Sequence, residues 1–260
     1  MKFPESFIPD KLDDRVELYL NKIGIDDQGL AIATGVQKST YHEGYIYVWE
    51  PSMREPKFIR KRDSLVLDLC YFKNKLYDCG PYKRIYDTLN DQEHVNSFVS
   101  ILAMKGYKKR LVHSQFNKIY MGKSELRRRK GWVYALEEHD NKLYDAGEYD
   151  AIYTTMGDGL VTKREGRVRA LCSHKGELYD AGDYGKVYNT LTGERVADRF
   201  SGEIYTLCSF KNLLLEGGTS GLITNAFTDE PFFDFGNCMV TALETVPASL
   251  VKELMKIANT

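Results

Sequence analysis

Apolar and polar residues alternate over short stretches along most of this chain. In one region the stretches 168–173, 178–182 and 186–190 alternate in this way, and short turns rich in glycine or aspartate separate them. Alternation with a period of two, together with many β-branched and aromatic residues, predicts β-strands. A weaker fourth strand is predicted at 195–200. No interval between these strands has room for a helix of about ten residues, so the region should consist of strands alone.

The same arrangement returns at a nearly constant interval. The phrase LYDAGEYDAIYTT at 143–155 is repeated closely at 76–88 and 178–190, and more loosely from Leu111 and Leu214. An apolar anchor precedes each phrase by seven residues, and successive anchors lie 35, 32, 35 and 36 residues apart. The anchors are Leu69, Met104, Leu136, Leu171 and Leu207. Because four antiparallel strands in about 35–45 residues are the size of one β-propeller blade, the period predicts an all-β propeller of four-stranded blades.

The number of blades depends on how the ends of the chain are used. Six units contain the first two strands, and the first of these units begins near Ile23. A lone strand around Leu243 follows 36 residues after Leu207 and has no second half. It either closes a six-bladed ring beside the N-terminal strands or begins a seventh blade that the N-terminus completes. The residues before Arg15 are too few for three strands, so we favour six blades over seven.

The end of the chain has a different pattern. We expect residues 1–246 to form a single propeller domain and residues 247–260 to form a short amphipathic helix, because Leu250, Val251 and Leu254 fall on one helical face. The helix either docks on the flank of the propeller, which we favour, or protrudes as an element for a partner.

Two hairpin segments resemble those of known propeller repeats. The segment 215–223, LEGGTSGLI, is similar to the hairpin between the second and third strands of WD40-type blades, and 181–190 resembles the Gly-x-x-Gly-x-Val pattern of the YCF48-like group. The resemblance covers roughly residues 15–243 and implies a β-propeller without pointing to one family. The Trp-Asp pair that names WD40 repeats is absent, since the tryptophans are Trp49 and Trp132. No family's functional residues can therefore be transferred.

The charge balance limits the kind of partner. The chain has 260 residues, with 36 Lys and Arg against 37 Asp and Glu, and its formal net charge is −1. This balance excludes a strongly basic, nucleic-acid-like overall charge, but it leaves room for a local basic patch. The N-terminus has no apolar core of signal-peptide length, and no segment approaches the length of a membrane span. We therefore expect a cytoplasmic protein without membrane contact.

The cysteines fit the same expectation. Cys70, Cys172 and Cys208 each directly follow a first-strand leucine. Because equivalent positions recur from blade to blade, these cysteines should be reduced, small, buried apolar residues rather than disulfide partners. There is no CxxC spacing, so a structural zinc site is not expected, and neither is any other metal or cofactor.

Carboxylates recur at one position of the repeat. Asp78, Asp145 and Asp180 share this position, and Glu216 and His113 fill it in other copies. A ring of carboxylates could bind a cation or act as acid and base. A repeated residue is not a unique catalytic set, however, and a carboxylate between blades usually accepts hydrogen bonds from a neighbouring loop. We predict this structural role, with a cost of about 1–3 kcal/mol when the aspartate is replaced by alanine.

Basic and aromatic residues recur in the connections between strands. Tyr82, Tyr149 and Tyr184 occupy equivalent hairpins between the second and third strands, and Phe116 joins them. These tyrosines either stack on a ligand or pack over the blade edge. The connections from the fourth strand to the next blade, which should open on the same face, are basic before the units of Leu69, of Leu136 and of Leu171. The predicted binding residues on this face are Arg60, Lys61, Arg62, Tyr82, Lys83, Arg84, Arg127, Arg128, Arg129, Lys130, Tyr149, Arg164, Arg167 and Tyr184.

These features favour a non-catalytic interaction module or scaffold, with no catalytic residue assigned. Its basic, tyrosine-bearing face would bind an anionic partner, either an acidic protein surface or nucleic-acid phosphates. The alternative is a propeller enzyme or small-ligand binder that uses the central channel and residues such as Asp145, Asp180 and Glu216. A third hypothesis is a lectin-like protein that binds one sugar per blade through the tyrosine and aspartate of each repeat. The absence of a secretion signal in the sequence counts against this hypothesis. The oligomeric state stays open.

Overall fold

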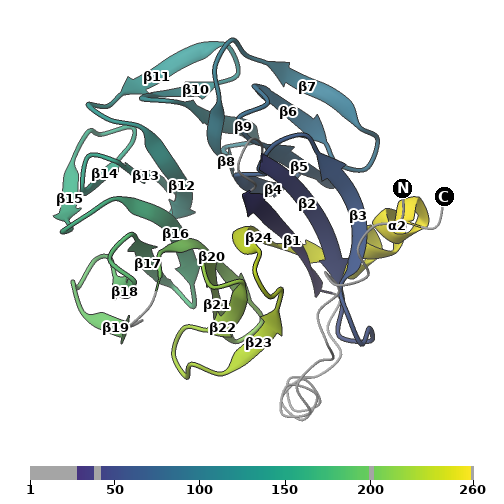
Figure 1. Cartoon of the computed structure of the whole chain (residues 1–260). Coiled ribbons are helices and arrows are strands. Elements are labelled where there is room, and N and C mark those ends of the chain that lie inside the picture. Colours follow the sequence, from purple (N-terminus) through teal and green to yellow (C-terminus); the bar gives the residue numbers. More distant parts are fainter. Residues whose placement is uncertain (1–27, 38–41, 199–201, 259–260) are drawn as a thin grey trace.

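The computed structural model describes residues 28–37, 42–198 and 202–258. These residues form six four-stranded antiparallel sheets, arranged as blades around a central axis (Figure 1). The prediction of an all-β propeller with six blades is thereby confirmed. No helix among the described residues is long and apolar enough to span a membrane.

The blades are numbered here in the order of the chain, and each is given from its innermost strand outwards. Blade 1 consists of β24 (Met239–Pro247), β1 (Gln28–Gln37), β2 (His42–Trp49) and β3 (Lys57–Arg62). Blade 2 consists of β4 (Asp68–Phe72), β5 (Lys75–Cys79), β6 (Arg84–Asp87) and β7 (Gln92–Asn96). Blade 3 consists of β8 (Ile101–Tyr107), β9 (Arg110–Gln115), β10 (Lys118–Met121) and β11 (Ser124–Arg128). Blade 4 consists of β12 (Val133–His139), β13 (Lys142–Gly147), β14 (Ala151–Thr154) and β15 (Leu160–Lys163). Blade 5 consists of β16 (Val168–His174), β17 (Glu177–Gly182), β18 (Lys186–Asn189) and β19 (Arg195–Asp198). Blade 6 consists of β20 (Ile204–Phe210), β21 (Leu213–Gly218), β22 (Leu222–Asn225) and β23 (Pro231–Asp234).

The ring closes by pairing strands from opposite ends of the chain. β24 is the innermost strand of blade 1 and runs antiparallel to β1, with Leu243 opposite Ile32. The lone strand around Leu243 therefore completes the N-terminal blade, as one of the two sequence-based alternatives required. Ile23, near which the first unit was expected to begin, lies outside the described residues, and β1 is the second strand of its blade.

The repeated apolar anchors lie on the innermost strands, where neighbouring blades pack face to face. Leu136 on β12 and Leu171 on β16 belong to one buried cluster that also contains Tyr144 and Ile152, so the cluster joins blades 4 and 5. The equivalent cysteines Cys70, Cys172 and Cys208 are buried on innermost strands and form no disulfide, as predicted.

The C-terminal helix docks on the flank of the propeller. α2 (Ala248–Ala258) directly follows β24 and lies beside β3 (Figure 1). Its apolar residues Leu250, Val251 and Leu254 are buried with Ile59 of β3 and Val246 of β24. Blade 1 is thus covered by the helix that the apolar pattern predicted.

Glycine is required at the end of the second strand in blades 4, 5 and 6. There the backbone of the second strand closely approaches the residue that precedes the innermost strand of the same blade. A Cβ atom on Gly147, Gly182 or Gly218 would lie 1.9 Å from a backbone carbonyl oxygen, for Gly182 that of Arg167. The register between β16 and β17 shifts at the same place, between Val168 and Ala170, so the inner strand bulges towards the glycine. These contacts hold the first and second strands of a blade close together on one face of the ring.

Candidate functional site

The recurring aspartates and arginines form ion pairs between blades. Asp78 on β5 of blade 2 is completely buried and faces Arg62, the last residue of β3 in blade 1. Arg62 donates from Nε and Nη2 to the two carboxylate oxygens of Asp78, both at 2.8 Å. The hydroxyls of Tyr82 and Thr88 also donate to Asp78, at 2.6 and 2.9 Å. The guanidinium lies over the ring of Tyr86, 4.3 Å from its centroid, so the blades are joined by both charge and stacking.

We call this arrangement the arginine lock, and it recurs twice. The second lock consists of Arg129, Asp145, Tyr149, Tyr153 and Thr155, and the third of Arg164, Asp180, Tyr184, Tyr188 and Thr190. In every lock the arginine stands 16 residues before the aspartate, the donor tyrosine 4 after it and the threonine 10 after it. The three locks therefore join blades 1 and 2, blades 3 and 4, and blades 4 and 5.

The lock uses the full acceptor capacity of its carboxylate. Asp145 accepts from Arg129 Nε at 2.6 Å, from Arg129 Nη2 at 2.7 Å, and from the hydroxyls of Tyr149 and Thr155 at 2.6 and 2.8 Å. An ionised carboxylate has about four lone-pair sites, so none is left for a metal ion or a proton in transit. Asp78, Asp145 and Asp180 thus accept hydrogen bonds between blades, as expected for a structural role, and the stability cost of replacing them stays a prediction.

The electrostatics of the lock favour the charged pair. Burial by itself lowers the pKa of Arg62, but the hydrogen bonds and charge of Asp78 raise that pKa by more, and the net shift is upward. Burial, followed by the charge of Asp180, raises the pKa of Tyr184 far above its usual value. Both shifts favour a protonated arginine beside a neutral tyrosine.

Six of the fourteen residues predicted to bind a partner belong to the locks, namely Arg62, Arg129, Arg164, Tyr82, Tyr149 and Tyr184. The three arginine side chains are only 6–9 % exposed. Their guanidinium groups face Asp78, Asp145 and Asp180, so these six residues join neighbouring blades.

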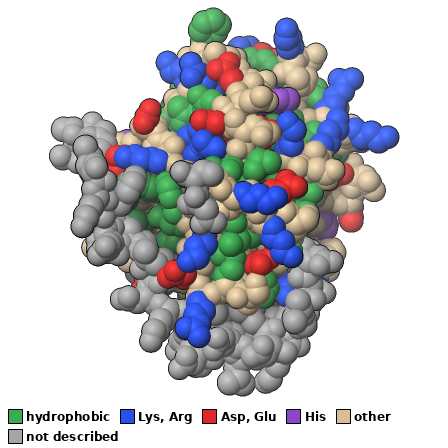
Figure 2. All heavy atoms as spheres, turned by 90° about the vertical axis from the view of Figure 1, so that its right-hand side faces the viewer, with side chains coloured by type: hydrophobic (Ala, Val, Ile, Leu, Met, Phe, Trp, Pro, Cys, Tyr) green, Lys and Arg blue, Asp and Glu red, His purple; other side chains and the backbone are tan. Residues whose placement is uncertain are grey.

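Most of the other predicted cations lie beside acids of their own chain. Arg60 pairs with Asp91 at 3.2 Å, and Arg127 pairs with Asp158 at 3.3 Å. The remaining pairs are Lys61–Glu43, Arg84–Glu93, Arg128–Glu125 and Arg167–Asp183. Lys83 and Lys130 are exposed, and within the described part of the chain no ion pair is found for either. On the side of the molecule seen in Figure 2, Lys and Arg side chains are scattered among acidic and apolar ones.

A different set of side chains gathers at the mouth of the central channel. Trp132, in the connection from β11 to β12, is 44 % exposed and packs on Phe116 of the β9–β10 hairpin, with ring centroids 5.0 Å apart. Its other neighbour is Tyr134 at 6.2 Å. The guanidinium of Arg169 lies between the rings of Tyr134 and Tyr205, 4.9 and 5.1 Å from their centroids. We call these five residues the mouth cluster; they form one continuous row of ring and guanidinium contacts over blades 3 to 6.

The contact between Trp132 and Phe116 brings two kinds of connection together. One is a fourth-to-first-strand connection and the other a second-to-third-strand hairpin. Both kinds therefore open on the same side of the ring, which we call the loop face. Arg169 is held in this row by Asp183, at 2.5 Å, and its Nη2 lies 3.6 Å from Glu203.

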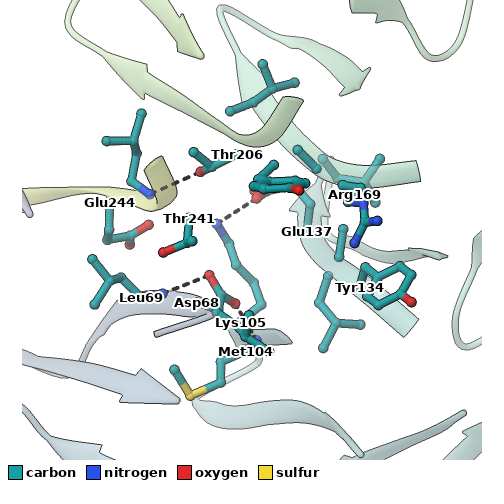
Figure 3. Close-up of a pocket in the computed structure, with 18 residues that line it drawn as sticks. Asp68, Leu69, Met104, Lys105, Tyr134, Glu137, Arg169, Thr206, Thr241 and Glu244 are labelled. Carbon is teal, nitrogen blue, oxygen red and sulfur yellow. Dashed lines mark hydrogen bonds and ion pairs between the residues drawn. The ribbon is translucent and has the colours of Figure 1, made fainter. Parts of the chain in front are cut away.

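Behind the mouth, the channel narrows to a small cavity lined by the innermost strands. The cavity has a volume of about 490 Å³ with its open end included, and Tyr134, Arg169 and Glu137 are among its lining residues (Figure 3). Lys105 Nζ donates to Glu137 Oε2 at 2.8 Å across the boundary between blades 3 and 4. Asp145 and Asp180, which the enzyme alternative placed in the channel, lie in the locks instead.

The carboxyl groups of the cavity have unusual proton affinities. Burial raises the pKa of Asp68 to about 8, although its oxygens accept the N–H groups of Met104 and Leu69 at 2.6 and 2.9 Å. Burial also raises the pKa of Glu244 to about 7, against the opposing effect of Lys105. The cavity can therefore hold protons at neutral pH.

The raised pKa of Glu244 predicts a pH dependence of stability. The folded protein keeps a proton on Glu244 up to about pH 7, whereas the unfolded chain releases that proton near pH 4.5. The protonated carboxyl therefore contributes fully to the stability of the folded protein below about pH 4.5, and this contribution is lost as the pH rises to about 7. Glu244→Gln should leave the free energy of unfolding unchanged at about pH 4 and raise it by about 1–3 kcal/mol at pH 8. Urea unfolding at several pH values, with exposed Glu165→Gln as the control, measures this; equal pH profiles for native protein and Glu244→Gln would contradict it.

The sequence-based prediction missed the mouth cluster except for Phe116. Tyr134, Arg169 and Tyr205 occupy the second position of the inner-strand pattern that reads VYAL, VRAL and IYTL in blades 4, 5 and 6. The sequence contained a signal for this cluster, because the second residue of the pattern changes between blades while the residues on either side of it stay small or apolar. The side chains at this second position line the central channel. They do not pack between neighbouring blades, so they need not be the same in every blade.

Comparison with known proteins supports the β-propeller fold but identifies no family or function. No protein-family model matches the chain, and no curated protein matches it. Among solved structures, the WD40 repeats of RRP9 match with a TM-score of 0.54 and 11 % identity, over 84 % of this chain and 88 % of that one. The WD40 β-propeller domain of Doa1 matches with a TM-score of 0.53 and 12 % identity, over 88 % and 86 % of the two chains. The chain thus has a β-propeller fold similar to that of WD40 domains, and these matches assign it to no specific family.

Proposed function

We propose that this chain is a non-catalytic interaction module whose mouth cluster binds a segment of a partner protein. The observation that carries the proposal is the exposed Trp132 on the loop face, which packs against the ring of Phe116 and meets the ring of Tyr134 edge-on. Trp, Tyr and Arg dominate the binding energy of protein interfaces, because they bury large areas and also supply polar contacts. The mouth cluster contains all three types.

The charges beside the mouth cluster favour an acidic flank on that segment. Lys130 and the half-exposed Arg167 lie within two residues of the cluster in the chain, and Arg169 is part of it. The partner would insert an apolar side chain beside Trp132 and present one or two carboxylates to these cations. A nucleic-acid backbone is a weaker candidate, because long phosphate tracks need a row of unpaired cations and most cations here have acidic neighbours.

Free cysteines support the cytoplasmic location that belongs to this proposal. All five cysteines are buried and unpaired, and reduced thiols are the normal state in a reducing compartment.

The test is affinity capture from a native extract, with and without nuclease, using the native chain and Trp132→Ser. Loss of a central tryptophan costs about 2 kcal/mol or more, which is roughly a 30-fold loss of affinity. Leu191→Ser is the matched control, since Leu191 is 53 % exposed but lies in the turn between β18 and β19, at the end of the strands opposite the loop face. A protein retained by the native chain and by Leu191→Ser but lost from Trp132→Ser supports the proposal; identical capture by all three would contradict it.

A further inference from the structure

The turns that leave the innermost strands form a second surface, away from the mouth cluster. All six innermost strands line the central cavity. Five of them, β4, β8, β12, β16 and β20, are each joined to the second strand of their blade by a turn of two residues. Because these turns lie at the end of the strands opposite the loop face, we call that side the turn face. The turns therefore surround the channel axis at the end away from the mouth.

Most of these turns begin with a lysine. The five turns are residues 73–74, 108–109, 140–141, 175–176 and 211–212, which read KN, KK, DN, KG and KN. We call Lys73, Lys108, Lys109 and Lys175 the inner-turn lysines. All four are exposed, and within the described part of the chain no ion pair is found for any of them. Blades 2 and 5 stand across the axis from each other (Figure 1), so these lysines approach the axis from both sides.

The backbone of these turns does not favour lysine. The inner-turn lysines have φ values between 44° and 64°. A two-residue hairpin turn with positive φ at both positions is normally made from Asn, Asp or Gly, because these residues tolerate the left-handed region. The turn of blade 4, Asp140 followed by Asn141, follows this preference. Lysines that recur at an unfavourable backbone position indicate that their charge has a use.

Two of the inner-turn lysines lie over aromatic rings at the ends of innermost strands. Nζ of Lys73 is 5.3 Å from the ring centroid of Phe72, and Nζ of Lys108 is 5.0 Å from that of Tyr107. A cation–π contact of this kind restricts the flexible lysine side chain. An ammonium group that is already restricted loses less entropy when it binds an anion.

The turns between the third and fourth strands have the opposite charge. In blades 2, 4, 5 and 6 these turns span residues 88–91, 155–159, 190–194 and 226–230, and each contains an acidic residue but no lysine or arginine. Because the third and fourth strands are the outer ones, the turn face has a basic centre and a largely acidic rim. A long polyanion or a flat anionic surface would meet the rim, whereas a compact anion would meet the centre alone.

We propose that the inner-turn lysines bind a compact anion with several phosphate groups at the turn-face end of the channel. Lysine suits such a ligand, because its ammonium is a point charge with three donors and does not need the planar geometry of an arginine contact. A free inositol polyphosphate and a phosphoinositide headgroup offer the same chemistry, and the test below separates the two sources. The site goes beyond the proposed function and shares no residue with the mouth cluster.

The probe is inositol hexakisphosphate, titrated into the full chain by isothermal calorimetry at physiological ionic strength. Lys108→Asn and Lys175→Asn should each weaken binding by about three- to tenfold, because each removes one charge from the set. Their melting temperatures without ligand should be unchanged or higher, because asparagine tolerates positive φ better than lysine. Weaker binding with such a melting temperature cannot result from loss of folding. Lys163→Asn, which changes an exposed lysine at the loop-face end of β15, is the matched control and should bind as the native chain does.

Vesicles separate the two sources of the phosphate groups. Binding to inositol hexakisphosphate or to vesicles that contain phosphatidylinositol bisphosphate supports the proposal, and tighter binding to these vesicles assigns the lipid headgroup. No saturable binding to either probe would overturn the proposal. Equally tight binding to phosphatidylserine vesicles of the same surface charge, or unchanged binding by Lys108→Asn and Lys175→Asn, would also overturn it.

The outcomes also separate this site from the proposed function. Trp132→Ser should bind inositol hexakisphosphate as the native chain does, so failure of the mouth cluster to bind a partner leaves the turn-face site standing. Lys175→Asn should in turn retain the partner that Trp132→Ser loses. Loss of inositol hexakisphosphate binding in Trp132→Ser would place the anion at the mouth and would overturn the proposal.

Discussion

Replacing Asp145 by alanine should lower the free energy of unfolding by about 3–5 kcal/mol, more than the sequence alone suggested. The change removes four hydrogen bonds at once and leaves the Arg129 guanidinium, only 6 % exposed, without its bidentate partner. Removing one member of a buried ion pair is strongly destabilising, because the remaining charge is neither solvated nor paired. Urea unfolding at pH 7 measures the effect.

The matched control for this change is Asp158→Ala. Asp158 also contacts Arg129, but its side chain is 51 % exposed, so its loss should cost less than about 1 kcal/mol. The double variant Arg129→Met/Asp145→Leu should recover much of the loss, since an apolar pair of similar volume often replaces a buried ion pair without penalty. If Asp145→Ala and Asp158→Ala cost the same, the lock is not a structural element.

Gly182→Ala should destabilise the protein by about 3–5 kcal/mol or prevent folding, because the new Cβ would lie 1.9 Å from the carbonyl oxygen of Arg167. Neither atom can move away without separating β16 from β17, which pair in this region. Thermal unfolding monitored by circular dichroism gives the measurement. Gly166→Ala is the control: its nearest neighbour is Tyr184 Cδ1 at 3.7 Å, so its stability should stay within about 1 kcal/mol of native. A normal melting temperature for Gly182→Ala would contradict the described packing.

The architecture could be predicted from the sequence because its cause is periodic. The anchors Leu136 and Leu171 recur at a blade-sized interval, and burial against a neighbouring blade requires an apolar residue at that position every time. The same periodicity made Asp145 and Asp180 recognisable as structural, since a residue repeated in several copies serves a need that those copies share.

The roles of the arginines could not be predicted in the same way. Arg129 and Lys130 are adjacent in a basic run, yet one is buried against Asp145 and the other is exposed. Composition shows the charge of such a run but not the direction of each side chain. The sequence does contain a constant separation of 16 residues between each arginine and its aspartate. This separation indicates an ion pair only once it is known that the connection between two blades brings the arginine next to the second strand of the following blade.

The mouth cluster was harder still, because its members come from different blades and the residue type at their positions changes between copies. Trp132, Tyr134 and Arg169 meet only because blades 4 and 5 converge on one axis. Function in a repeat protein lies where the copies differ, and a search for similarity between the copies passes over those positions.

The most direct test of the account separates stability from binding on the loop face. The partner captured by the native chain would be titrated against Arg129→Met and Trp132→Ser at a temperature at which both variants give native circular dichroism spectra. The account predicts that Arg129→Met melts at a lower temperature but binds normally, and that Trp132→Ser melts normally but binds about 30-fold more weakly. Loss of binding in folded Arg129→Met, together with normal binding by Trp132→Ser, would contradict it.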